Sequence, residues 1–134
     1  MILKIIKDYS YALRCKHVSD EKTSEFKYTL IHSTPIAGIR YKYSSLNNKG
    51  QFGIPKVIFG ESGINHVIID IKGEYGIADS AMAIIIENQE EGEILKKALL
   101  SNEFKLLLKS CMWANFGIEW NLFKYFKKDF WKEL

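Results

Sequence analysis

The stretch Gly53-Ile54-Pro55-Lys56-Val57-Ile58-Phe59-Gly60 decides the fold, because its apolar centre lies between residues that favour turns. Asn47-Asn48-Lys49-Gly50 precedes it, and asparagine and glycine tolerate the positive φ angles of tight turns. A second apolar run covers residues 66–72 and ends at Gly73. The pattern predicts two buried strands that carry polar, glycine-rich loops, an arrangement typical of binding proteins.

Three further runs predict strands around this pair. Tyr28–His32 is rich in β-forming residues, Gly38–Ser44 alternates between apolar and polar side chains, and Ala83–Ile86 is apolar throughout. A strand over Gly38–Ser44 would present tyrosines on one face and the cations Arg40 and Lys42 on the other. The cationic face could contact phosphates, or it could simply be solvated.

The apolar period changes to that of a helix from Glu90 to Leu100. Ser101-Asn102 can cap a second helix, and the aromatic and basic tail over residues 118–134 predicts a third. We therefore predict an α+β fold, in which a small mixed or antiparallel sheet precedes a helical hairpin and an aromatic C-terminal helix.

Two parts are expected along the chain. Residues 1–25 predict an N-terminal helix and a linker, because the apolar positions of the first 14 residues fit one helical face and Ser19–Glu25 is wholly polar. We expect residues 26–134 to form the main domain.

The composition is ordinary for one globular domain of 134 residues, with 47% hydrophobic and 26% charged residues. The net charge of +3 permits a nucleic-acid partner but does not require one. No apolar run approaches the ~18 residues of a membrane helix, so we expect no membrane partner and a cytoplasmic location. The three histidines are scattered without ligand spacing, which argues against a metal site.

No catalytic motif is evident: the phosphate-binding and nucleophile patterns GxxxxGK, GxGxxG and GxSxG are absent. Asp70-Ile71-Lys72 is similar to the acid-x-lysine half of Mg²⁺-dependent restriction-type nucleases, with Glu61 as a possible partner carboxylate. The alternative is that Asp70 and Lys72 mark a strand that reaches solvent.

A wider resemblance covers residues 20–134 and rests on an ordered set of segments: Tyr28–His32, Gly38–Tyr43, Gly53–Gly60, Ile69-Asp70 with Gly73-x-Tyr75-Gly76, Ala98-Leu99-Leu100-Ser101-x-x-Phe104, and Phe126–Trp131. This set resembles the C-terminal target-recognition region of N6-adenine DNA methyltransferases of restriction–modification systems, including the fused type IIG enzymes. The resemblance implies double-stranded DNA as the partner. It also implies a separate methyltransferase catalytic domain that binds S-adenosylmethionine and flips the adenine.

The catalytic Asn/Asp-Pro-Pro-Tyr motif of that family is absent, because Pro35 and Pro55 have no proline neighbour. We therefore expect sequence-selective DNA binding with no catalytic residue and no cofactor in this chain. The expected contacts come from loops between Ser44 and Gly53 and between Gly60 and Asn65. The residues expected to contact phosphates are Arg40, Lys42, Lys49 and Lys56, and a contact with guanine is the alternative for Arg40. The residues expected to reach base edges through their amides are Asn47, Asn48, Gln51 and Asn65.

Two other function classes remain open. The first is the small nuclease built on Asp70 and Lys72. The second is a protein–protein interaction domain whose partner docks on the aromatic tail.

Overall fold

The computed structural model describes residues 5, 6, 8–60 and 65–102, which form two sheets and a helix. The first sheet is antiparallel throughout, in the order β1 (Ile5–Ile6), β8 (Ala81–Ile85), β5 (Lys56–Gly60) and β6 (Val67–Asp70). The second has the order β2 (Val18–Ser19), β4 (Arg40–Ser44), β3 (Tyr28–Ser33) and β7 (Gly76–Ile77), and only the β3–β7 pair is parallel. Helix α1 spans Gln89–Leu99.

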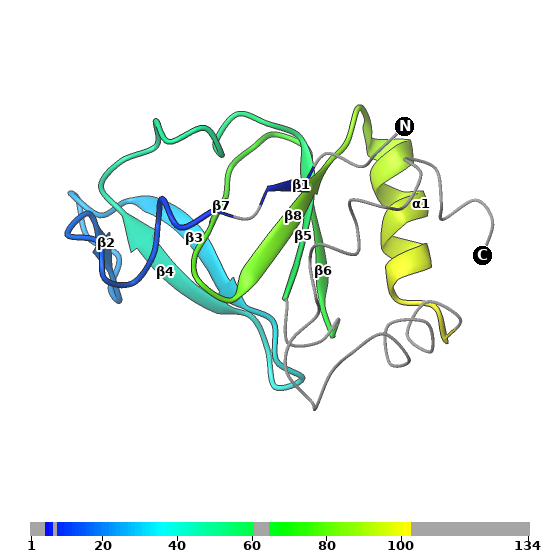
Figure 1. The fold of residues 1–134 in the computed structure, drawn as a ribbon, viewed down its shortest axis with the longest axis horizontal. Coiled ribbons are helices and arrows are strands. Elements are labelled where there is room, and N and C mark those ends of the chain that lie inside the picture. The colour runs from blue at the N-terminus through cyan, green and yellow to red at the C-terminus, as the bar shows by residue number, and fades with distance from the viewer. Residues whose placement is uncertain (1–4, 7, 61–64, 103–134) are drawn as a thin grey trace.

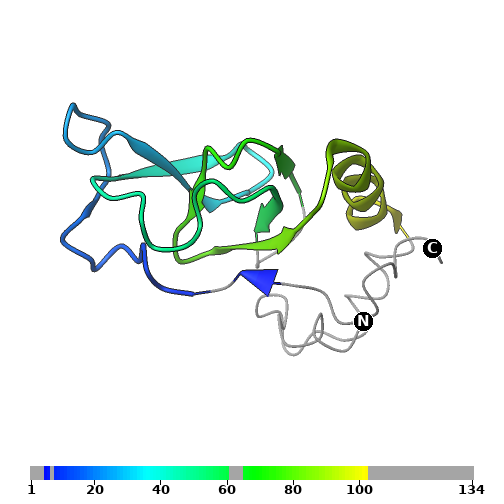
Figure 2. The ribbon, with the colours of Figure 1, turned by 90° about the horizontal axis from the view of Figure 1, so that it is seen from above.

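The first sheet is the middle of three layers. Helix α1 covers one of its faces, and the second sheet lies on the other side (Figures 1 and 2). Strand β5 shows why: Val57 and Phe59 belong to the cluster that packs under the helix, whereas Ile58 belongs to the cluster shared with the second sheet. Side chains of a strand alternate between faces, so a strand covered on both sides is apolar throughout.

The five strand predictions and one of the helix predictions from the sequence are confirmed. All five predicted strands are present as β3, β4, β5, β6 and β8, and the helix expected over residues 90–100 is α1. Asn88 caps this helix by accepting a hydrogen bond from the Glu91 backbone N–H at 2.8 Å. The α+β class is therefore correct, but the strands form two sheets rather than one small sheet. The second helix of the hairpin and the aromatic C-terminal helix lie outside the described residues.

The predicted N-terminal helix is wrong for the part of residues 1–25 that the structure describes. Ile5–Ile6 pairs with β8, and Val18–Ser19 pairs with β4. Between these short strands, Tyr11 and Ala12 are fully buried. The apolar pairs at the start of the chain fit a strand as well as a helix, and the open edge of β8 offers backbone partners that a separate helix would not use.

No helix in the described part of the chain is long and apolar enough to cross a membrane.

Candidate functional site

Two of the eight predicted DNA contacts are buried, and both predictions are wrong. Lys56 and Gln51 are each 0% exposed, so neither side chain reaches a partner. The Lys56 Nζ donates to the Asp70 Oδ2 at 2.7 Å, to the Gln51 carbonyl at 3.0 Å and to the Ile54 carbonyl at 3.3 Å. All three ammonium protons are thus used inside the protein.

The Asp70 carboxylate is equally occupied. Besides Lys56, it accepts hydrogen bonds from the backbone N–H groups of Glu74 at 2.8 Å and Tyr75 at 3.0 Å. Burial lowers the pKa of Lys56, although the hydrogen bond and the attraction of Asp70 act in the opposite direction. Because Asp70 fastens a lysine and a turn, the geometry gives it a structural role and does not favour the nuclease alternative.

Gln51 extends this network toward the second sheet. Its Oε1 accepts from the Ile77 N–H at 2.7 Å, and its Nε2 donates to the Asp8 Oδ1 at 2.8 Å. The buried amide of Gln51 therefore joins the N-terminal segment to strand β7, and the backbone carbonyl of the same residue binds Lys56. Buried polar groups with all partners satisfied make a region rigid.

The loop over residues 45–50 directly precedes Gln51 and its buried network of hydrogen bonds. Asn47, Asn48 and Lys49 are exposed, as predicted for residues that contact a partner. The loop begins at Ser44, whose Oγ accepts from the Leu46 N–H at 2.9 Å and donates to the Leu46 carbonyl at 2.8 Å. Near its end, the Lys49 N–H donates to the buried Tyr11 hydroxyl at 3.2 Å.

Arg40 and Lys42 start strand β4 and have different surroundings. Arg40 is exposed, and among the described residues no carboxylate pairs with it. Lys42 is paired with Asp20 at 2.7 Å, with side-chain exposures of 22% and 81%. The hydrogen bond from Lys42 lowers the pKa of Asp20. Such an exposed pair is weak, so an anionic partner can compete for the lysine.

His32 lies on β3 close to both cations. Burial lowers its pKa, Lys42 and Arg40 lower it further, and Asp79 and Asp20 oppose them. Within the described part of the chain, its Nδ1 is buried and has no hydrogen-bond partner.

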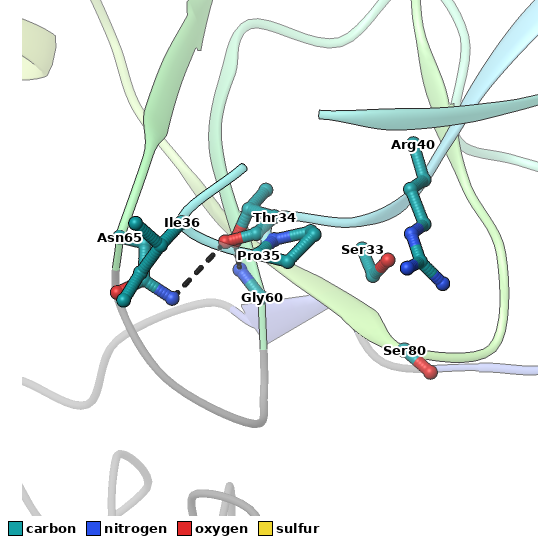
Figure 3. A pocket seen from close by; sticks show the side chains of 8 residues that line it. All are labelled: Ser33, Thr34, Pro35, Ile36, Arg40, Gly60, Asn65 and Ser80. Carbon is teal, nitrogen blue, oxygen red and sulfur yellow. Dashed lines mark hydrogen bonds between the residues drawn. The ribbon is translucent and has the colours of Figure 1, made fainter. Parts of the chain in front are cut away.

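A cavity of about 430 Å³ opens where the ends of β3 and β5 meet the starts of β4 and β8. Figure 3 shows the Arg40 side chain reaching from β4 toward Ser80, with Ser33 beside it. The other lining residues are Thr34, Pro35, Ile36, Gly60 and Asn65.

Thr34 holds this cavity together. It is 3% exposed, its Oγ1 accepts from the Gly60 N–H at 2.9 Å, and its carbonyl accepts from the Asn65 Nδ2 at 3.2 Å. Asn65, another predicted contact, is exposed at this rim. The loop residues between Gly60 and Asn65 lie outside the described residues.

Five of the predicted contacts therefore form two separate groups at the ends of β4, and Lys42 lies between them on the strand. Arg40 and Asn65 line the cavity at the start of β4, whereas Asn47, Asn48 and Lys49 follow the far end of that strand. Four steps of about 3.4 Å place the two ends of β4 roughly 14 Å apart.

The sequence analysis missed the cavity residues Ser33, Thr34 and Ser80. Ser33-Thr34-Pro35 signals a turn in the sequence, and nothing local indicates that it meets the end of β5 in space.

Comparison with models of protein families, with curated proteins and with solved structures finds no significant match to this chain.

Proposed function

We propose that this protein is a sequence-selective double-stranded DNA-binding module. In this proposal it acts as the target-recognition part of a restriction–modification adenine methyltransferase. The methyl donor S-adenosylmethionine would bind to a separate catalytic domain or subunit, and this chain would supply the contacts that choose the site.

One observation carries the proposal: a short loop exposes two amides and a cation from a rigid base. Asn47, Asn48 and Lys49 are all exposed, while Ser44 and Tyr11 hold the two ends of their loop through hydrogen bonds. Side-chain amides can donate to and accept from adenine in the major groove, and lysine meets phosphates. Because both ends of the loop are already held in place, the loop loses less conformational entropy when it binds a partner.

Arg40 and Lys42 extend the cationic contribution along β4. The separation of roughly 14 Å between the two ends of this strand is compatible with contacts to phosphates on both sides of a groove, since the B-DNA major groove is about 12 Å wide. Lys56 and Gln51 have no part in the proposed interface, because they are buried beneath it.

The test is a fluorescence-anisotropy titration with a pool of mixed-sequence duplexes at about 50 and 200 mM salt, with and without Mg²⁺. We expect affinity that falls steeply with salt and does not depend on Mg²⁺. Lys49→Ala should weaken binding and reduce the slope of log K against log salt by about 0.9, the contribution of one phosphate contact.

The matched control is Lys97→Ala, which removes another exposed lysine, from helix α1 in the opposite outer layer. This variant should bind DNA like the wild type. Absence of binding at the lower salt concentration, or equal losses in both variants, would contradict the proposal.

A further inference from the structure

We propose that the cavity beside Arg40 is a binding site for a phosphate ester of about the size of a mononucleotide. This inference goes beyond duplex recognition. The cavity shares Arg40 with the proposed duplex interface, but it lies at the other end of β4 from the 45–50 loop that carries the proposed function. Its volume of about 430 Å³ falls in the range of small-molecule sites, roughly 300–1,000 Å³.

The charge of the lining selects an anion. Among the described residues that line the cavity, Arg40 is the one charged side chain, and none of them carries a carboxylate. The arginine comes into the cavity from β4 with its guanidinium group toward Ser80 (Figure 3). A planar guanidinium group donates two parallel hydrogen bonds to a phosphate, and it stays charged at every physiological pH.

Polar groups around the arginine suit the same ligand. The Ser33 and Ser80 hydroxyls line the side on which Arg40 lies, and hydroxyl groups can donate to phosphate oxygens. On the far side, Asn65 uses its Nδ2 to bind the Thr34 carbonyl. The Oδ1 atom of Asn65 can accept a hydrogen bond from an amino group of a base.

The remaining wall is apolar. Pro35 and Ile36 both line the cavity, and Ile36 is 83% exposed. In Figure 3, Pro35 lies between Asn65 and Ser33. An exposed isoleucine next to a proline offers an apolar surface against which a base or a sugar can pack. A phosphate alone would leave this surface in water, so the lining favours a phosphate that carries an organic body.

Hydrogen bonds of Thr34 hold the walls of this cavity in place. Thr34 is buried and joins β3 to Gly60 through its hydroxyl group and to Asn65 through its carbonyl. A cavity whose walls are already fixed loses little entropy when it binds.

The experiment uses the full chain and three probes: inorganic phosphate, adenosine 5′-monophosphate and adenosine. Binding is followed by titration calorimetry and by amide shifts in ¹H–¹⁵N spectra. We expect saturable binding of the nucleotide with a dissociation constant below about 1 mM, weaker binding of phosphate and no binding of adenosine. The shifts should centre on Ser33, Gly60 and Asn65.

Arg40→Gln should raise the dissociation constant at least about tenfold, as expected for the loss of a charged hydrogen-bonding group. Arg40→Lys should bind more tightly than Arg40→Gln but more weakly than the wild type, because lysine keeps the positive charge but cannot donate two parallel hydrogen bonds. The matched control is Arg14→Gln, which removes the chain's other arginine, also exposed, and should not change binding. Unchanged circular dichroism spectra check that the variants fold.

Three results would overturn the inference: no binding of any probe at about 10 mM, equal binding of adenosine and its phosphate, or unchanged affinity in Arg40→Gln. Duplex binding without mononucleotide binding would reject the cavity as a phosphate site and leave the proposed function standing. Mononucleotide binding without duplex binding would do the reverse.

Discussion

Removal of the buried ammonium group should strongly destabilise this protein. In Lys56→Met the apolar stem is largely kept, but Asp70 stays as a carboxylate with a side-chain exposure of 2% and no cation beside it. The change also removes the hydrogen bonds from Nζ to the Gln51 and Ile54 carbonyls. Breaking a buried pair on one side costs about 3–5 kcal/mol, which three charged hydrogen bonds of about 1–3 kcal/mol each can account for.

Urea unfolding, followed by far-ultraviolet circular dichroism at neutral pH, measures this loss. A domain of this size unfolds with a slope of about 2 kcal/mol per M urea, so the midpoint should fall by about 1.5–2.5 M. Asp70→Asn should produce a loss of similar size. The double variant should lose less than the sum of the two by at least about 1 kcal/mol, because it leaves no unpaired charge in the interior.

Lys72→Met is the matched control, since it removes an exposed lysine two positions after Asp70. It should change the free energy of unfolding by less than about 0.5 kcal/mol. The reasoning fails if Lys56→Met lies within about 0.5 M of the wild-type midpoint, or if the losses of the two single variants simply add.

Three further predictions concern pH, backbone and capping. His32 has a lowered pKa in the fold, mainly through burial, so below its ordinary value of 6.5 the unfolded chain binds more protons than the native one. The free energy of unfolding should therefore fall as pH drops below about 6.5. Melting curves recorded at several pH values should show a melting temperature that depends less on pH in His32→Phe than in the wild type. An equal pH dependence in the two proteins would contradict this role of His32. Gly73→Ala should lose more than about 1–2 kcal/mol, because φ is +68° and the added Cβ would meet the backbone of Gly53 and Ile54; a melting temperature equal to that of the wild type rejects this. Asn88→Ala should lose about 1 kcal/mol by removing the cap of α1, whereas Asn88→Asp, which keeps an acceptor, should not.

The sequence predicted most of the local structure because the local signals agree with one another. The apolar run at Val57-Ile58-Phe59 has turn residues on both sides, and it is a strand buried on both faces. The helix over residues 89–99 has a matching cap, acidic first turn and apolar stripe. The exposure of Asn47, Asn48 and Lys49 also follows from the sequence, since that run of turn residues has little to bury.

The role of a charged side chain did not follow in the same way. Lys56 and Arg40 are both cations at a strand terminus, and both were predicted to contact phosphate. Lys56 is fully buried because Asp70 lies opposite it in the β5–β6 register, while Arg40 is exposed beside a cavity. Burial of a lysine requires a partner, and strand register rather than sequence distance supplied it.

Local sequence patterns are enough to predict the five main strands and helix α1, because the spacing of apolar residues sets which faces must leave water. Long-range packing sets how these strands divide into two sheets and which polar groups meet. It also adds Ile5–Ile6 to one sheet and Val18–Ser19 to the other. The Lys56–Asp70 pair joins residues 14 positions apart, and the cavity brings Arg40 together with Gly60 and Ser80 from distant parts of the sequence. Such contacts arise from long-range pairing, which the local pattern does not encode.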